Sequence, residues 1–310
     1  MSHSAHQKKR RIVVVGSSGR LGGLLASGLE QNHVVTGLSR KQLDLACLDS
    51  ISNTLESLDY DHVIIAGALT GVDYCETNEA ESFAVNATGA GRIAEISAAK
   101  DAHVTYFSTD MVYDGNRLDP YTEDDATHPI SVYGASKLKG EELVLAASAN
   151  NLVLRVSWLY GPGRPAFPEW IINKACAEAH VTLPGNKVGC STSTVDLLTL
   201  LQPLLFGPEG AASGIFNLCN SGQCSWRDWG QLCIDTARSA GLPVIADQIE
   251  GVSVDSVPAF VAKRPVNSAM STAKYTRLTG IVPRTWQVAN REFLEHCELF
   301  TKHQAASSIL

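Results

Sequence analysis

Short apolar runs alternate with segments of helical periodicity over the first half of the chain. The run RIVVVG at 11–16 is rich in β-branched residues and ends in glycine, which is typical of a strand buried in a parallel sheet. Later runs have the same character, and segments with apolar residues three and four positions apart lie between them. We therefore expect strands at 11–16, 33–39, 62–68, 103–109 and 151–158, and helices at 21–31, 79–100 and within 128–144.

Strands that alternate with helices at this spacing predict βαβ units with right-handed crossovers. The expected fold class is α/β, a doubly wound parallel Rossmann sheet with a smaller C-terminal substrate-binding lobe. After residue 160 glycine and proline become frequent and strand signals weaken. We expect an NADP-binding Rossmann domain at 10–160 to which part of 193–225 returns, a substrate-binding lobe at 161–192 and 226–300, and flexible tails at 1–9 and 301–310.

Composition narrows the class of protein. The chain has 310 residues, of which 45% are hydrophobic, so it can bury a full core, and its net charge of −7 argues against a nucleic-acid surface. None of the eight cysteines forms a C-x-x-C pair, which predicts reduced thiols in a cytoplasmic protein and no metal site. The apolar runs are too short to cross a membrane, so we expect no membrane partner.

A glycine-rich turn follows the first expected strand. Gly16, Gly19 and Gly22 have a G-x-x-G-x-x-G spacing between a strand and a helix, the context of a dinucleotide-binding loop. The first glycine allows the turn, the second lets the backbone approach a pyrophosphate, and the third allows close packing of helix on strand. The alternative is a glycine turn that binds no ligand.

The end of the second strand indicates which nicotinamide cofactor binds. An NAD site would place an acidic residue there for the ribose hydroxyls. Instead Ser39 and Arg40 follow the strand, and the first acid is Asp44. Arg40 is suited to a 2′-phosphate, with assistance from Arg20, so we expect NADPH, with NADH as the alternative. Arg40 as a solvated surface charge is the competing interpretation.

Candidate catalytic residues lie at the fourth strand and the next helix. Ser108 and Thr109 end the strand, at the sheet edge where a nicotinamide would lie. Tyr133 and Lys137 are one helical turn apart and share a face, which in isolation describes many helix surfaces. Together the four residues predict carbonyl reduction. Tyr133 would donate the proton, Lys137 would lower the pKa of the phenol and hold the ribose, and Thr109 would orient the carbonyl.

These motifs resemble the extended short-chain dehydrogenase/reductase superfamily, and within it the dTDP-4-dehydrorhamnose reductase family. Five stretches along 11–295 carry the closer resemblance, of which the last is the least generic for the superfamily. They are AGALTGVDYCE (66–76), STDMVYDG (108–115), PYTEDDATHPISVYGASKLKGEE (120–142), RVSWLYG (155–161) and KRPVNSAMSTAKY (263–275).

The resemblance implies reduction of the C4 ketone of a nucleotide-linked 6-deoxy-4-keto sugar by NADPH, in deoxysugar biosynthesis. It carries Thr109, Tyr133 and Lys137 over as catalytic, and it implies a homodimer. Substrate-binding residues would be Thr70, Asp110, Met111, Trp158 and Arg264; Trp158 would otherwise be read as a core aromatic. Cofactor-binding residues would be Gly16, Ser18, Gly19, Arg20, Leu21, Ser39, Arg40, Asp44, Leu45, Ala66, Gly67, Ala68, Asn86, Ser108, Tyr133 and Lys137.

The chain departs from the family pattern on the substrate side. Met111 replaces a sugar-binding tyrosine, Leu69 a common histidine, Asn186-Lys187 an Asp-Gln pair and Ser191 a proline. These changes leave two alternatives open: a non-catalytic regulatory subunit resembling that of methionine adenosyltransferase, or a reductase or epimerase of another nucleotide sugar. Arg164, Lys263 and Arg264 are candidates for the substrate pyrophosphate or, equally, surface charges.

Overall fold

Six parallel strands form the central sheet of the computed structural model, which describes residues 9–208 and 210–301. Strand β2 lies on one side of β1. Strands β3, β4, β5 and β10 follow one after another on the other side, which gives the order β10-β5-β4-β3-β1-β2. The order reverses at β1, so the ends of β1 and β3 flank a topological switch point. The expected doubly wound parallel α/β sheet is confirmed. The strands are β1 Arg11–Val15, β2 Val34–Leu38, β3 His62–Ile65, β4 His103–Thr109, β5 Leu152–Val156 and β10 Gly214–Asn217.

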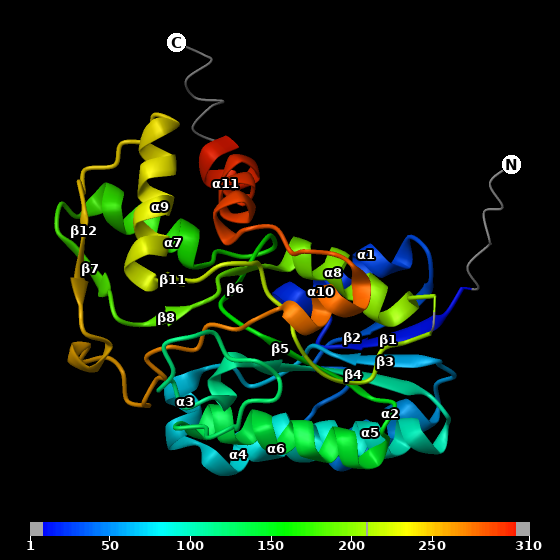
Figure 1. Cartoon of the computed structure of the whole chain (residues 1–310). Coiled ribbons are helices and arrows are strands. Elements are labelled where there is room, and N and C mark those ends of the chain that lie inside the picture. The colour runs from blue at the N-terminus through cyan, green and yellow to red at the C-terminus, as the bar shows by residue number, and fades with distance from the viewer. Residues whose placement is uncertain (1–8, 209, 302–310) are drawn as a thin grey trace, which may run out of the picture.

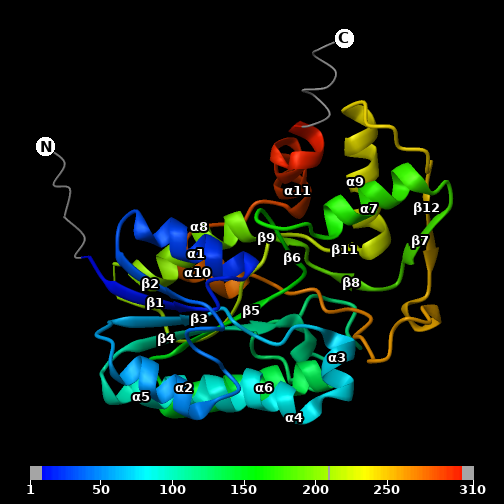
Figure 2. The same ribbon diagram turned by 180° about the vertical axis from the view of Figure 1, so that it is seen from behind.

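Helices cover both faces of the sheet (Figures 1 and 2). Alternate residues of β1 pack into the two layers, Val13 and Val15 into one and Ile12 and Val14 into the other. Both faces of the strand are therefore apolar, which explains its unbroken hydrophobic run. One layer is α2 Leu48–Glu56, α5 Gly89–Ala99 and α6 Val132–Ala147; the other is α1 Arg20–Glu30, α8 Thr194–Phe206 and α10 Ala273–Thr279.

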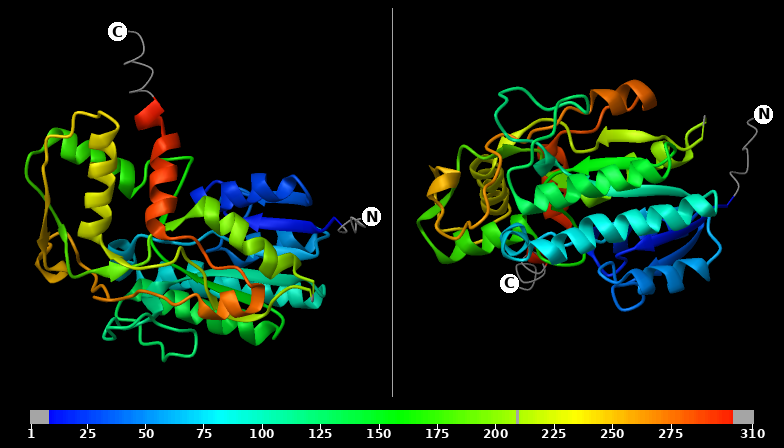
Figure 3. Two further views of the ribbon diagram at one scale, coloured as in Figure 1. Left: turned by 45° about the horizontal axis from the view of Figure 1, so that its top comes forward. Right: turned by 90° about the horizontal axis from the view of Figure 1, so that it is seen from below.

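A smaller lobe stands beyond the end of β5 (Figure 3). Its core contains buried Trp229, Trp286 and Phe300. Strand β7 pairs in parallel with β12, while β6 pairs with β9 and β8 with β11 where the lobe meets the sheet. The elements are β6 Leu159–Tyr160, α7 Phe167–Ala177, β7 Val181–Pro184, β8 Val188–Gly189, β9 Thr192–Ser193, β11 Cys224–Ser225, α9 Trp226–Ser239, β12 Ile249–Val252 and α11 Trp286–His296.

The helix expected at 79–100 is continuous but irregular. It consists of α4 Glu79–Phe83, a π-helical turn η1 Ala84–Thr88, and α5. The wider turn places Asn86 inward, where its amide bonds the backbone of Leu69 through both atoms, at 2.8 and 2.9 Å. This turn therefore fixes the loop after β3, as π turns at functional sites often do.

The remaining elements are short. They are α3 Val72–Thr77 and the 3₁₀ turns η2 Asp110–Val112 and η3 Val254–Ser256. The tails expected at 1–9 and 301–310 lie outside the described residues except for Lys9 and Thr301. Within the described ranges, no helix combines the length and the apolar character needed to cross a membrane.

Candidate active site

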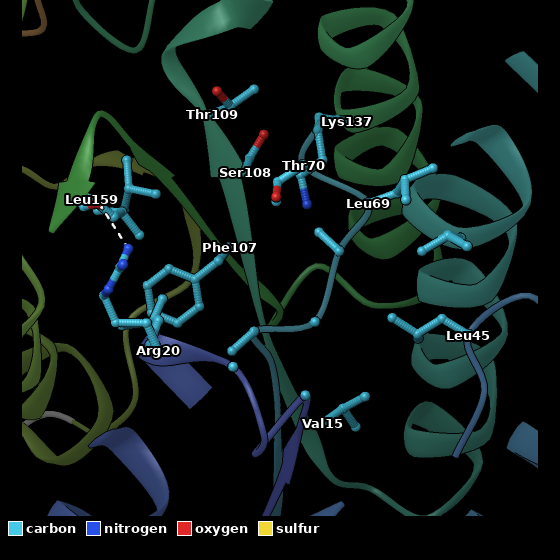
Figure 4. Close-up of a pocket in the computed structure, with 18 of the residues that line it drawn as sticks. Val15, Arg20, Leu45, Leu69, Thr70, Phe107, Ser108, Thr109, Lys137 and Leu159 are labelled. Carbon is cyan, nitrogen blue, oxygen red and sulfur yellow. Dashed lines mark hydrogen bonds between the residues drawn. The ribbon is translucent and has the colours of Figure 1, made fainter. Parts of the chain in front are cut away.

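A cavity of about 590 Å³ opens at the carboxyl edge of the sheet, beside the topological switch point. The glycine turn, the ends of β3 and β4, and the start of α6 all line it (Figure 4). It gathers most of the residues that the sequence predicted for cofactor and substrate. Those lining it are Gly16, Ser18, Gly19, Arg20, Leu21, Arg40, Asp44, Leu45, Ala66, Gly67, Ala68, Thr70, Ser108, Thr109, Asp110, Tyr133, Lys137 and Trp158.

Two glycines of the turn have no room for a side chain. Gly16 has φ +87°, and a Cβ there would lie 2.5 Å from the Cα of Gly67. A Cβ on Gly22 would lie 2.2 Å from the carbonyl oxygen of Gly16. Helix α1 begins directly after Gly19, which makes no side-chain cap, so its first N–H groups face the cavity as donors for an anion.

Tyr133 and Thr109 meet at the cavity wall. Ser131 caps α6 by accepting a hydrogen bond from the backbone N–H of Gly134, which fixes the first turn of the helix and thus Tyr133. Burial raises the pKa of the half-buried phenol, its hydrogen bond with Thr109 lowers the pKa, and the charge of Asp110 raises it again. Thr109 Oγ1 itself donates to Asp110 Oδ1 at 3.1 Å. A phenol held on a hydroxyl at an open cavity can act as a proton donor.

Lys137 lies one turn further along α6, only 1% exposed (Figure 4). Desolvation lowers the pKa of its ammonium group to about 7, while the Glu141 carboxylate raises it. Among the described residues its Nζ has no hydrogen-bond acceptor and lies 3.9 Å from the centroid of the Tyr106 ring. A buried donor without a partner that lines the cavity is suited to ligand oxygens.

A buried ion pair lies behind this wall, and the sequence analysis missed it. Glu141 accepts from Arg155 Nη2 at 2.7 Å and from Ser108 Oγ at 2.5 Å, and both charged side chains are at most 3% exposed. Arg155 also donates to Tyr113 Oη at 2.9 Å. Ser108 therefore lines the cavity, but its hydroxyl donates its proton to Glu141. The i, i+4 spacing of Tyr133, Lys137 and Glu141 was the signal that could have revealed the pair.

Arg40 lies at the far end of the cavity, beyond the glycine turn. Its side chain is 70% exposed, and its guanidinium is 3.8 Å from Asp44 and 3.9 Å from Glu81. These distances are loose, so the guanidinium can turn towards an anion in the cavity. Ser39 lies outside the cavity lining, and its hydroxyl donates to Gln42 Oε1 at 2.7 Å.

Arg20 reaches the loop after β6 in addition to lining the cavity (Figure 4). Its guanidinium donates to the carbonyl oxygens of Leu159, Arg164 and Pro165, at 3.3, 3.1 and 2.8 Å. Three acceptors hold the group in place. The structure therefore gives Arg20 the task of tying the glycine turn to the start of the lobe, whereas the sequence analysis assigned it to assist at the phosphate.

Trp158 forms the wall towards the lobe. Its φ of +44° lies in the left-handed region that residues other than glycine rarely adopt. The indole stacks on Trp229 with ring centroids 5.9 Å apart, and a Cβ on Gly189 would lie 2.6 Å from its Cζ2. Packing therefore sets this side chain against the cavity in a strained conformation.

Three further predicted residues lie away from the cavity lining. Asn86 binds the Leu69 backbone, as described above, and Met111 is 9% exposed in η2. Arg264 is paired with Asp73, with its Nη2 2.6 Å from the carboxylate, and this ion pair holds the pKa of Asp73 down at about 2. Within the described residues, no group of three or more histidine, cysteine or acidic side chains is arranged to bind a metal ion.

Comparisons with known proteins agree with this geometry. A family model described as RmlD substrate binding domain matches residues 10–299. The chain is 31% identical over 294 residues to dTDP-4-dehydrorhamnose reductase of Sinorhizobium fredii, which covers 92% of this chain and 96% of the relative. It is 31% identical over 263 residues to the enzyme of the same name from Escherichia coli, covering 83% and 86%.

A solved structure shows the same fold. The crystal structure of dTDP-4-dehydrorhamnose reductase from Bacillus anthracis, in complex with NADP, superposes with a TM-score of 0.85 at 26% identity. It covers 93% of this chain and 100% of that one. The similarity therefore extends over both the sheet and the lobe.

Proposed function

The chain belongs to the RmlD substrate binding domain family, with dTDP-4-dehydrorhamnose reductases among its relatives, and we propose the corresponding reaction for it. It is an NADP-dependent oxidoreductase that reduces the C4 ketone of a nucleotide-linked 6-deoxy-4-keto sugar in deoxysugar biosynthesis. One observation carries the assignment of its chemistry. The Tyr133 phenol, hydrogen-bonded to Thr109, shares a cavity with the unpartnered ammonium of Lys137 and the glycine turn.

The residues present fit NADPH. The backbone of the glycine turn carries no side chain at Gly16 and Gly22, where a Cβ has no room. The start of α1 offers N–H donors to the pyrophosphate. Lys137 Nζ, which has no hydrogen-bond partner among the described residues, would donate to the ribose hydroxyls. Arg40 would meet the 2′-phosphate. When bound, the cofactor supplies the hydride that reaches the ketone carbon.

Side chains of the protein donate a proton and a hydrogen bond to the ketone oxygen. Tyr133 donates its phenolic proton to that oxygen. Thr109 Oγ1 orients the oxygen by a hydrogen bond, for which the hydroxyl proton turns from Asp110 Oδ1 to the ketone. When it is protonated, the Lys137 ammonium one helical turn away stabilises the phenolate that remains. Asp110 and Trp158 face the sugar, and Thr70 lies on the same cavity wall.

The test is NADPH oxidation with freshly prepared dTDP-4-keto-6-deoxy-L-mannose, with NADH in parallel. Wild-type protein should consume NADPH faster than NADH. Tyr133→Phe should retain NADPH affinity and lose about 10²–10⁴-fold in kcat, because general acid catalysis supplies that much. Full turnover by Tyr133→Phe would refute the mechanism. Absence of turnover by the wild type would refute the proposed function.

The non-catalytic alternative is not favoured. The curated relatives named above are reductases, and the chain keeps Thr109, Tyr133 and Lys137 in one site. The altered substrate side, with Met111 and Leu69, bears on which sugar is accepted rather than on whether a ketone is reduced.

We also propose that the protein forms a homodimer and is cytoplasmic. Four apolar side chains along α10, α11 and the segment that joins them are exposed, Leu278, Ile281, Val282 and Val288, which supports a homodimer through this part of the chain. All eight cysteines are free thiols, which supports a cytoplasmic location. Light scattering on the purified chain would give the oligomeric state, and a monomer would refute the first proposal.

A further inference from the structure

Lys187, which precedes β8, ends a buried chain of polar groups that reaches the candidate proton donor. Its Nζ donates to Ser268 Oγ at 2.8 Å, and Ser268 Oγ donates to Asp110 Oδ2 at 2.5 Å. The other oxygen of Asp110 accepts from Thr109 Oγ1 at 3.1 Å, and Thr109 is hydrogen-bonded to the phenol of Tyr133. Lys187 is 2% exposed and Asp110 3% exposed.

The backbone holds the two ends of this chain in place. Lys187 and Ser268 are 81 positions apart, yet Ser268 N donates to the carbonyl oxygen of Val188 at 2.9 Å. Val188 N donates to the carbonyl oxygen of Val266 at 2.7 Å, and the Lys187 carbonyl accepts from Trp226 N at 3.2 Å. The ammonium group is thus delivered to Ser268 by a fixed backbone rather than by a mobile loop.

The charges around Lys187 identify Asp110 as its electrostatic partner. Burial lowers the pKa of the Lys187 ammonium group to about 8. Of the side chains around it, the Asp110 carboxylate raises that pKa, the Arg264 guanidinium lowers it and the Cys190 thiol raises it. The guanidinium of Arg264 is already neutralised by Asp73. Both hydrogen bonds that the Asp110 side chain accepts within the described residues come from hydroxyl groups. A buried carboxylate needs a compensating charge, and Lys187 supplies it across one hydroxyl.

The same ammonium also faces the sugar-facing indole. Lys187 Nζ lies 5.5 Å from the centroid of a Trp158 ring. Trp158 is the residue with the strained backbone, so a cation on its face helps to hold it there. Lys187 therefore contacts two parts of the cavity wall without lining the cavity itself.

We propose that Lys187 is a positioning residue for the reduction: through Ser268 it holds the Asp110 carboxylate against Thr109, and it offsets the negative charge beside Tyr133. This inference rests on the proposed function. The ammonium loses its proton near pH 8, so its charge acts on Asp110 below about that pH and is absent above it. The rate advantage that Lys187 gives to ketone reduction would therefore fade as the pH rises through about 8.

The test compares Lys187→Met with wild type and with Lys174→Met, which removes a lysine paired with Glu178 at the surface of α7. The substrates are NADPH and the keto sugar. Lys187→Met should bind NADPH normally and lose about 10-fold in kcat at about pH 6.5, and this loss should shrink as the pH rises through about 8, where the wild-type lysine becomes neutral. Lys174→Met should match wild type in all three.

A second variant separates charge from hydrogen bonding. Lys187→Gln keeps a donor for Ser268 but no charge, so part of the kcat should return, and the loss that remains should also fade above about pH 8. A wild-type pH profile in Lys187→Met, or a loss of kcat of the same size below and above about pH 8, would overturn the inference. Inactive wild-type protein would overturn the proposed function, and this inference with it; an active wild type isolates the role of Lys187.

Discussion

Lys137→Met is expected to stabilise the cofactor-free protein while it abolishes the reaction. Lys137 is buried with no hydrogen-bond acceptor for its Nζ in the described part of the chain, and only the Tyr106 ring faces it closely. An ammonium group that leaves water without a partner costs free energy, which is why its pKa is so low. Methionine has a similar volume and length and carries no charge, so it should fill the site without a cavity.

The pKa gives the size of the effect. A drop from 10.5 to about 7 corresponds to roughly 5 kcal/mol against the charged form in the folded state. The cation–π contact with Tyr106 returns roughly 2 kcal/mol. Below about pH 7, where folded and unfolded chains both carry the charge, Lys137→Met should therefore raise the free energy of unfolding by about 3 kcal/mol. As pH rises from about 7 to 10.5 the folded lysine becomes neutral first, so this gain should shrink and vanish.

Urea unfolding without cofactor, at about pH 6 and about pH 10, would measure both values. Lys139→Met is the matched control, because Lys139 is on the same helix, half exposed, and paired with Glu142 alone among the described residues. Saturating NADPH should stabilise the wild type and leave Lys137→Met nearly unchanged. The reasoning is refuted if Lys137→Met is no more stable than Lys139→Met at the lower pH, or if its advantage persists at the higher one.

Three other substitutions test the surroundings of the site. Glu141→Gln leaves the Arg155 charge buried and unpaired, and should lower the free energy of unfolding by about 3–5 kcal/mol in urea; a loss under 1 kcal/mol would contradict the role of the ion pair. Arg40→Ala should weaken NADPH binding about 10-fold or more in a fluorescence titration while NADH binding stays constant, and an equal loss for both would argue against a 2′-phosphate contact. Arg264→Met should cost about 1–3 kcal/mol at neutral pH, and the cost should disappear as pH falls from about 4 towards 2, because the lowered pKa of Asp73 stabilises the fold only while the carboxylate is ionised. A cost that persists at the lowest pH would show that Arg264 acts through packing.

The sequence predicted those parts of the fold and the cavity that depend on short spacings. Strands β1 and β3 were predictable because each is apolar on both faces, and the glycine turn because Gly22 packs on the carbonyl oxygen of Gly16, a few residues away. Tyr133 and Lys137 appeared because one helical turn joins them. The resemblance to a family then assigned roles to residues whose spacing alone predicts none.

What the sequence did not predict depends on contacts across long stretches of chain. Ser268 meets Lys187 and Asp110 from 81 and 158 positions away, and no local pattern marks such a meeting. The same applies to Arg264, which pairs with Asp73 at a separation of 191 residues instead of facing a pyrophosphate. Arg20 was expected at a phosphate because its neighbours are glycines, whereas carbonyl groups from 139 to 145 residues away hold it.

The contact between Trp158 and Gly189 has a consequence for anyone who wishes to change which sugar this protein accepts. Because an added Cβ would lie 2.6 Å from the indole, any larger residue at 189 displaces the ring. Glycine at 158 removes that obstacle and also relieves a backbone that tryptophan occupies at φ +44°. Libraries that randomise position 189 alone would therefore consist mainly of misfolded or inactive clones. A combinatorial library over both positions would contain the variants in which a new pocket shape is compatible with a stable protein.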